Sequence, residues 1–135
     1  MSGKPLRALL IEDNPIHARL IEKLLEEVGS YDVALQTGGT LATGLEMLGR
    51  GEDFDVVLLD LVLPDSQEMD TYFRVRAAVP ELPVLILSGI DDVTLASRAV
   101  EAGAQDYLVK TSLDAQTLGR SIRYAREITH AQRSE

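Results

Sequence analysis

The stretch "FDVVLLDLVLPDSQEMD", residues 54–70, sets a carboxylate, Asp60, between two apolar runs. Four apolar residues, 56–59, precede Asp60, and three more, 61–63, follow it. A charge in apolar surroundings costs free energy unless it is paired. A short apolar run rich in Val and Leu is typical of a strand that is buried on both faces. We therefore expect Asp60 to stand where such a strand ends, at the edge of a sheet.

Short apolar runs alternate with segments of helical periodicity along the chain. The runs predict five strands, at residues 6–11, 31–36, 55–59, 82–87 and 105–109. The helical segments begin near residues 15, 40, 72, 91 and 113, and the predicted helix caps are Thr40, Asp70 and either Asp91 or Asp92. Strict alternation implies a parallel sheet with helices on both faces, joined by right-handed crossovers.

The composition is that of a single globular domain. The chain has 135 residues, and we expect its core at about 6–128, with a polar tail at 129–135. The net charge of -9 argues against a nucleic-acid partner, which would need clustered Lys and Arg. The sequence has no cysteine, which excludes disulfides and thiolate metal sites. It also lacks signal-peptide features and any apolar run of about 20 residues, so we expect a cytoplasmic protein without a membrane partner.

Polar residues follow four of the five predicted strands. They are Glu12 and Asp13 after the first, Asp60 at the third, Ser88 after the fourth and Lys110 after the fifth. Ligands of open parallel sheets bind beyond the carboxyl ends of the strands. Neighbouring carboxylates repel one another unless a cation is present, and oxygen ligands suit Mg²⁺. With a lysine and a hydroxyl beside them, they fit phosphoryl transfer, and Asp60 is the expected nucleophile.

Four motifs in this order resemble those of the receiver domain of two-component response regulators, the chemotaxis-regulator-like family. The motifs are "LLIEDN", "VVLLDLVLPD", "PVLILSG" and "GAQDYLVK", and the resemblance covers about residues 6–128. It implies a flavodoxin-like (βα)5 fold, a doubly wound parallel sheet with strand order 2-1-3-4-5. Such a domain catalyses its own phosphorylation and dephosphorylation and is not a conventional enzyme.

The resemblance also implies a metal site and a phosphoacceptor. Glu12, Asp13, Asp60 and the backbone carbonyl of Val62 would hold Mg²⁺. Asp60 would accept a phosphoryl group from a sensor histidine kinase or a phosphotransfer protein.

Three further residues would read out the phosphoryl group. Ser88 and Lys110 would bind its oxygens, and Tyr107 matches the aromatic switch position of the family. Tyr107 would turn inward when Ser88 is drawn toward the phosphoryl group. This movement would alter an output face formed by the segments that follow Asp91 and Tyr107. That face would bind a downstream protein or a second copy of the chain in a homodimer.

Three positions depart from the usual pattern of the family. Glu68 stands where glycine is usual, and a left-handed backbone there would cost about 1–2 kcal/mol. Gly89 stands where alanine is frequent, and its missing Cβ should open the phosphoryl group to water. Thr111 replaces a proline whose preceding bond is usually cis. A cis bond before Thr111 would cost about 3 kcal/mol, so we expect either a trans bond with a shifted loop or a strained cis bond.

Two other classes of function compete with a phosphorylated receiver: an enzyme, either a phosphatase or a flavin protein, and a pseudo-receiver. An aspartate-nucleophile phosphatase usually has a second acidic residue two positions after its nucleophile, where this chain has Val62. A flavin protein would have a loop rich in glycine and hydroxyl residues after the first strand, where this chain has "EDNPIH". A pseudo-receiver binds partners without phosphorylation. It usually lacks a residue of the acidic pair, the phosphoacceptor aspartate or the lysine, and this chain retains all of them, as Glu12, Asp13, Asp60 and Lys110. "TGGTLATG", residues 37–44, lacks the lysine of a phosphate-binding loop and predicts a turn.

The sequence predicts no functional role for either of the two histidines. His17 is expected to be a solvated residue of the first helix, and His130 lies in the tail.

Overall fold

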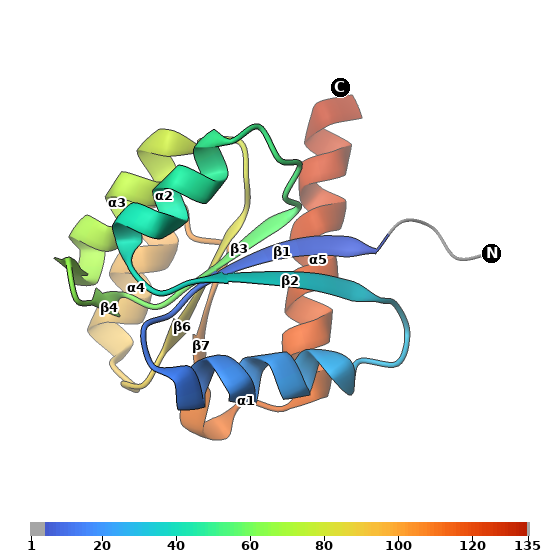
Figure 1. The fold of residues 1–135 in the computed structure, drawn as a ribbon, viewed down its shortest axis with the longest axis horizontal. Helices are drawn as coiled ribbons and strands as arrows, with labels where there is room; N and C mark the ends of the chain where they lie inside the picture. Colours follow the sequence, from blue (N-terminus) through green and yellow to red (C-terminus); the bar gives the residue numbers. More distant parts are fainter. Residues whose placement is uncertain (1–4, 135) are drawn as a thin grey trace.

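A five-stranded parallel sheet forms the centre of the molecule (Figure 1). The computed structural model describes residues 5–134, and of residues 129–134 only the backbone. The strands lie in the order β2-β1-β3-β6-β7, which confirms the predicted order 2-1-3-4-5 of the large strands. Their bounds are β1 Leu6–Ile11, β2 Val33–Gly38, β3 Val56–Leu59, β6 Val84–Ser88 and β7 Asp106–Val109.

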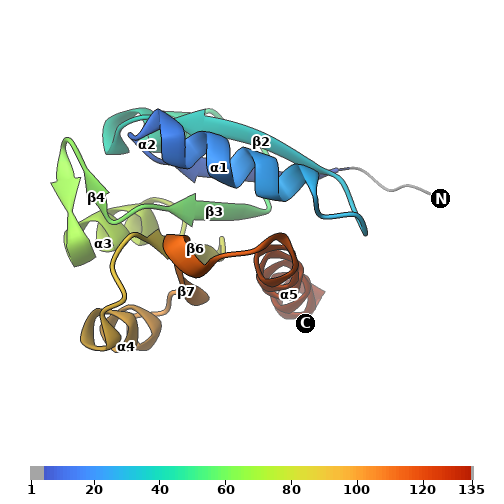
Figure 2. The same cartoon turned by 90° about the horizontal axis from the view of Figure 1, so that it is seen from below.

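Helices cover both faces of this sheet (Figures 1 and 2). They are α1 Pro15–Glu26, α2 Leu41–Gly49, α3 Glu68–Ala78, α4 Val93–Glu101 and α5 Ala115–Ser134, with a 3₁₀ turn, η1, at Lys110–Ser112. In β3, Val57 and Leu59 pack with α2, α3 and α4, whereas Val56 and Leu58 pack with α1 and α5. Because successive side chains of a strand point to opposite faces, every residue of this strand must be apolar.

Polar side chains fix where the helices begin. Asn14 accepts hydrogen bonds from the first amides of α1, with Pro15 as its first residue, while Thr40 and Asp92 cap α2 and α4. The carboxylate of Asp65 also accepts two hydrogen bonds of 2.9 Å, from the amides of residues 41 and 42 at the start of α2. The segment after Asp60 is thereby tied to a helix that precedes it in the chain.

The segment after Asp60 has regular secondary structure before the next helix begins. Strands β4 Val62–Leu63 and β5 Ser66–Gln67 form a small antiparallel ribbon. Helix α3 begins directly after it, at Glu68, so the prediction that Asp70 caps this helix is wrong. Asp70 lies in the first turn instead. The backbone of Glu68 is left-handed, with φ 52°, and its amide donates a 2.7 Å hydrogen bond to the carbonyl of Leu61.

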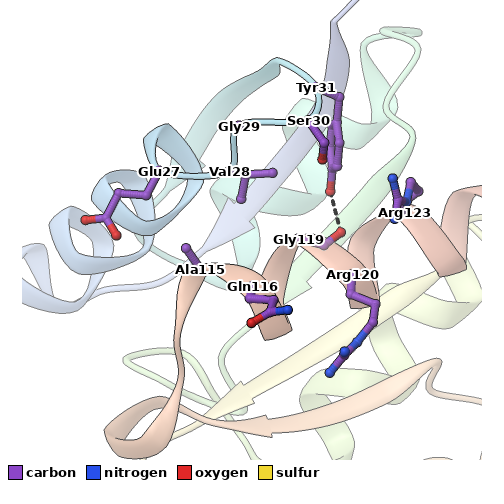
Figure 3. A pocket seen from close by; sticks show the side chains of 10 residues that line it. All are labelled: Glu27, Val28, Gly29, Ser30, Tyr31, Ala115, Gln116, Gly119, Arg120 and Arg123. Atoms are coloured by element: carbon purple, nitrogen blue, oxygen red, sulfur yellow. Dashed lines mark hydrogen bonds between the residues drawn. The ribbon is translucent and has the colours of Figure 1, made fainter.

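Two other boundaries differ from the prediction. Strand β2 begins at Val33 and not at Tyr31, because its pairing with β1 begins with Val33 opposite Leu6; the Tyr31 hydroxyl donates a hydrogen bond to the carbonyl of Gly119 in α5 (Figure 3). Helix α5 continues to residue 134, through most of the predicted tail. The side chain of His130 lies outside the described residues. Within residues 5–134, none of the helices combines the length and the apolar character needed to cross a membrane.

The close approach of α2 to β1 leads to a first prediction. A Cβ on Gly44 would lie 2.4 Å from Cδ1 of the fully buried Ile11, so Gly44→Ala should destabilise the fold by about 1–3 kcal/mol through overpacking. Gly49→Ala is the control in the same helix, because a Cβ there meets nothing within 4 Å. Urea unfolding measures both variants, and equal midpoints for them would contradict the packing argument.

Candidate functional site

The carboxyl ends of four strands bring a buried polar cluster to one edge of the sheet. Glu12 and Asp60 directly follow β1 and β3, Ser88 ends β6, and Lys110 follows β7. The parallel register aligns these ends, since Ile11 pairs with Leu59 and residue 88 with residue 109. We call this edge, at the carboxyl ends of the strands, the rim. Among the described side chains, five polar or charged ones are buried, and four of them are the rim residues Glu12, Asp60, Ser88 and Lys110. The structure brings Glu12, Asp60 and Lys110 into contact and places Ser88 at the same edge of the sheet, while the roles given to these four residues stay predictions.

The ammonium group of Lys110 lies at the centre of this cluster. Its Nζ donates hydrogen bonds to Oε1 of Glu12 and, at 2.8 Å, to Oδ2 of Asp60. All three side chains are buried, so their charges have lost most of their hydration. Pairing is therefore what makes these charges tolerable in the fold.

Backbone amides hold the remaining oxygens of the two carboxylates. Oδ1 of Asp60 accepts a 2.9 Å hydrogen bond from the amide of Val62, and Oε2 of Glu12 accepts one of 3.2 Å from the amide of Asn14. Each carboxylate thus accepts a hydrogen bond on one oxygen from an amide two residues later in the chain, and on the other oxygen from the Lys110 ammonium. These contacts fix the rotamers of both side chains.

The cluster holds more negative charge than Lys110 offsets. Burial raises the pKa of Glu12 from 4.5 to about 7, and the neighbouring Asp60 carboxylate adds to the rise, while Lys110 opposes it. A carboxyl group with such a pKa is partly protonated near neutral pH. The site therefore favours any additional cation that reaches it.

His17 belongs to this cluster, so the prediction that it is merely solvated is wrong. Its Nδ1 lies 3.2 Å from Nζ of Lys110 and 3.8 Å from Oε1 of Glu12, with 42% of its side chain exposed. His17 stands in the first turn of α1, and helical side chains tilt toward the N-terminal end, which here is the rim. The helix start at Asn14–Pro15 was the sequence signal that could have placed it there.

Asp13 lies apart from the cluster. Its side chain is exposed, and the group of ligand atoms within 4.8 Å of one another consists of Glu12, His17 and Asp60. The contact between Val62 and Asp60 is made by the Val62 amide, which donates to Oδ1 of Asp60. The metal-binding roles of Asp13 and of the Val62 carbonyl stay predictions.

Ser88 and Tyr107 meet at a shared residue, Ile90. The Ser88 hydroxyl accepts a 3.0 Å hydrogen bond from the amide of Ile90, and the Tyr107 hydroxyl donates one of 2.8 Å to the Ile90 carbonyl. Tyr107 is half-buried and belongs to the strand next to β6. A movement of Ser88 would therefore reach Tyr107 through a single residue of the connecting loop.

The three departures from the family pattern are accommodated without disturbing the rim. Within residues 5–134 every peptide bond is trans, including the one before Thr111, and Lys110 still reaches both carboxylates. A Cβ on Gly89 would meet nothing within 4 Å. Glu68 has the left-handed backbone considered above, and its hydrogen bond to Leu61 helps to hold it there.

Comparisons with known proteins agree with this geometry. The family model of the response regulator receiver domain matches residues 8–123. The chain is 35% identical over 105 residues to the cell cycle transcriptional regulator CtrA of Caulobacter vibrioides, which covers 78% of this chain and 44% of CtrA. It is 34% identical over 131 residues to the transcriptional regulatory protein ZraR of Escherichia coli, which covers 97% of this chain and 29% of ZraR. The chain thus spans less than half the length of either relative.

A solved structure shows the same fold. A response regulator receiver domain protein from Clostridium thermocellum superposes with a TM-score of 0.81 at 28% identity, over 93% of this chain and 98% of that one.

The raised pKa of Glu12 predicts how stability depends on pH. Between pH 4.5 and about 7 the folded protein holds a proton on Glu12 that the unfolded chain has released. Its free energy of unfolding should therefore fall as the pH rises through this window, by on the order of 1–3 kcal/mol. Urea unfolding in EDTA at several pH values measures the slope. Glu12→Gln cannot titrate and should show a flatter dependence; identical slopes would contradict the assignment.

Proposed function

The chain belongs to the response regulator receiver domain family, and we propose that it is switched by phosphorylation of Asp60. The donor would be a sensor histidine kinase or a phosphotransfer protein carrying a phosphohistidine. The observation that carries this proposal is the buried Asp60 carboxylate, held by Lys110 on one oxygen and by a backbone amide on the other.

Asp60, Lys110 and Ser88 would each have a different role in phosphoryl transfer. An oxygen of Asp60 attacks phosphorus, the P–N bond of the phosphohistidine breaks, and its electron pair stays on the donor imidazole. Lys110 turns its charge from the carboxylate to a phosphoryl oxygen, and Ser88 donates its hydroxyl to another. Catalysis of this kind depends on positioning and charge stabilisation, which the amides of residues 14 and 62 prepare.

The donor set of the site fits Mg²⁺. Glu12 and Asp60 already share one cation, and burial, together with the neighbouring Asp60 carboxylate, raises the pKa of Glu12. These two residues would hold the ion together with Asp13 and the carbonyl of Val62. When bound, Mg²⁺ supplies positive charge that offsets the carboxylates and the phosphoryl oxygens.

The switch would run from Ser88 through Ile90 to Tyr107. When Ser88 turns to a phosphoryl oxygen, the Ile90 amide loses its acceptor, and the loop that also holds the Tyr107 hydroxyl is free to rearrange. Exposed apolar side chains lie on this side of the molecule, at Ile90, Val93 and Val100. We propose that they belong to the output face, which binds a downstream protein or a second copy of the chain.

A pseudo-receiver that works without phosphorylation is the alternative. It would have no need of a nucleophile, a lysine and an acid in mutual contact, and this chain retains all three. That contact favours the phosphorylated receiver.

Phosphorylation itself is the first test of this function. With acetyl phosphate and Mg²⁺, the wild-type protein should gain the mass of one phosphoryl group, since Asp60 is the only proposed acceptor. The Asp60→Asn variant is nearly isosteric and should gain none. An equal gain in both proteins, or none in the wild type, would contradict the proposal.

Gly89 should shorten the life of the phosphorylated state. Gly89→Ala adds a methyl group in open space, so it should shield the acyl phosphate from water without straining the loop. We expect the half-life of phospho-Asp60 to lengthen severalfold, measured as loss of the phosphoryl mass after removal of the donor. Gly39→Ala, which also meets nothing within 4 Å, is the control for an added methyl group on the surface. An unchanged half-life in Gly89→Ala would show that access of water is not limited here.

A further inference from the structure

We propose that His17 supplies a nitrogen ligand to this site, which then binds a first-row divalent transition ion more tightly than Mg²⁺. The inference rests on the proposed function, because the carboxylates concerned are those of the phosphorylation site. It differs from the usual oxygen-only site of the family by one residue of this chain.

The Lys110 ammonium marks the point at which a cation is bound. Three acceptor atoms, from Glu12, Asp60 and His17, surround Nζ, those of Asp60 and His17 at 2.8 and 3.2 Å. The same three residues offer ligand atoms that all lie within 4.8 Å of one another, close to the span of about 4 Å between ligands of one ion.

The imidazole of His17 turns its Nδ1 atom to this point. An ammonium group can only donate, so the 3.2 Å contact is a hydrogen bond in the tautomer that has its lone pair on Nδ1 and its proton on Nε2. A neutral imidazole with a free lone pair on Nδ1 is the form in which histidine binds metals. With 42% of its side chain exposed, His17 can also adjust its ring to a metal ion.

One nitrogen among oxygen ligands changes which ion is preferred. Mg²⁺ is hard, demands oxygen ligands and dehydrates reluctantly. Imidazole raises the affinity for Mn²⁺, Co²⁺, Ni²⁺ and Zn²⁺, in the order that these ions follow at mixed N/O sites. A site with two carboxylates and one imidazole therefore favours a transition ion over Mg²⁺.

Binding would exchange one cation for another. A metal ion and the ammonium cannot share the same point, because both are positive. The ion would displace Nζ, and the flexible lysine side chain would then be available for a phosphoryl oxygen. His17 thus acts on the metal, while Lys110 acts on the phosphoryl group.

Calorimetric titration of the full, untagged chain with Co²⁺ and with Mg²⁺ tests the inference. We expect tighter binding of Co²⁺ than of Mg²⁺ by the wild type, and visible absorption bands typical of nitrogen ligation. His17→Ala should weaken Co²⁺ binding at least about tenfold, since loss of even an outer-shell partner costs about 10–100-fold. Its Mg²⁺ affinity should change little, and circular dichroism would verify that it folds.

His130→Ala is the matched control, because it removes the other imidazole of the chain and should leave Co²⁺ binding unchanged. Equal Co²⁺ affinities of wild type and His17→Ala, or a loss in His130→Ala alone, would overturn the inference. Acetyl phosphate with Mg²⁺ separates the two proposals. If Asp60 is phosphorylated but His17→Ala binds Co²⁺ normally, only the nitrogen ligand fails. If the His17 effect holds but Asp60 is never phosphorylated, the receiver function fails.

Discussion

The buried ammonium of Lys110, shared between Glu12 and Asp60, is the interaction on which the rim depends. Removing one member of a buried ion pair leaves an uncompensated charge, which costs about 3–5 kcal/mol. The ends of β1, β3 and β7 must therefore remain where the three side chains can meet. The apolar strands supply this rigidity, since the side chains of β3 pack alternately against the helices on the two faces of the sheet.

Much of the fold could be predicted from the sequence, because its strands are apolar on both faces and its helices have clear ends. The segment after Asp60 could not. Its order rests on contacts that no local pattern encodes: the Glu68 amide on the Leu61 carbonyl, and the Asp65 carboxylate on a distant helix start. Strand β2 also starts later than predicted, because its start is set by the first residue of its partner β1, Leu6, which lies opposite Val33.

The site was predictable where the position of a residue along a strand decides its place. Glu12, Asp60 and Lys110 follow strands that end at one edge, so their convergence followed from the parallel order. Position along a strand does not decide how the side chains of Asp13 and His17 are placed. Asp13 is adjacent to Glu12 in sequence but points into solvent, whereas His17, a helical turn later, returns to the rim. Side-chain direction at the start of a helix, rather than residue type, separates these two.

The balance of charge at this edge of the sheet is what the proposed ligands would change. Two buried carboxylates face one ammonium, and burial, with the Asp60 carboxylate beside it, raises the pKa of Glu12 to about 7. Under the proposed function, a bound cation would take the place of the Lys110 ammonium, and a phosphoryl group on Asp60 would give that ammonium a new partner. Because Ser88 and Tyr107 both bond to Ile90, a movement of Ser88 toward the phosphoryl group would reach the surface through that one residue.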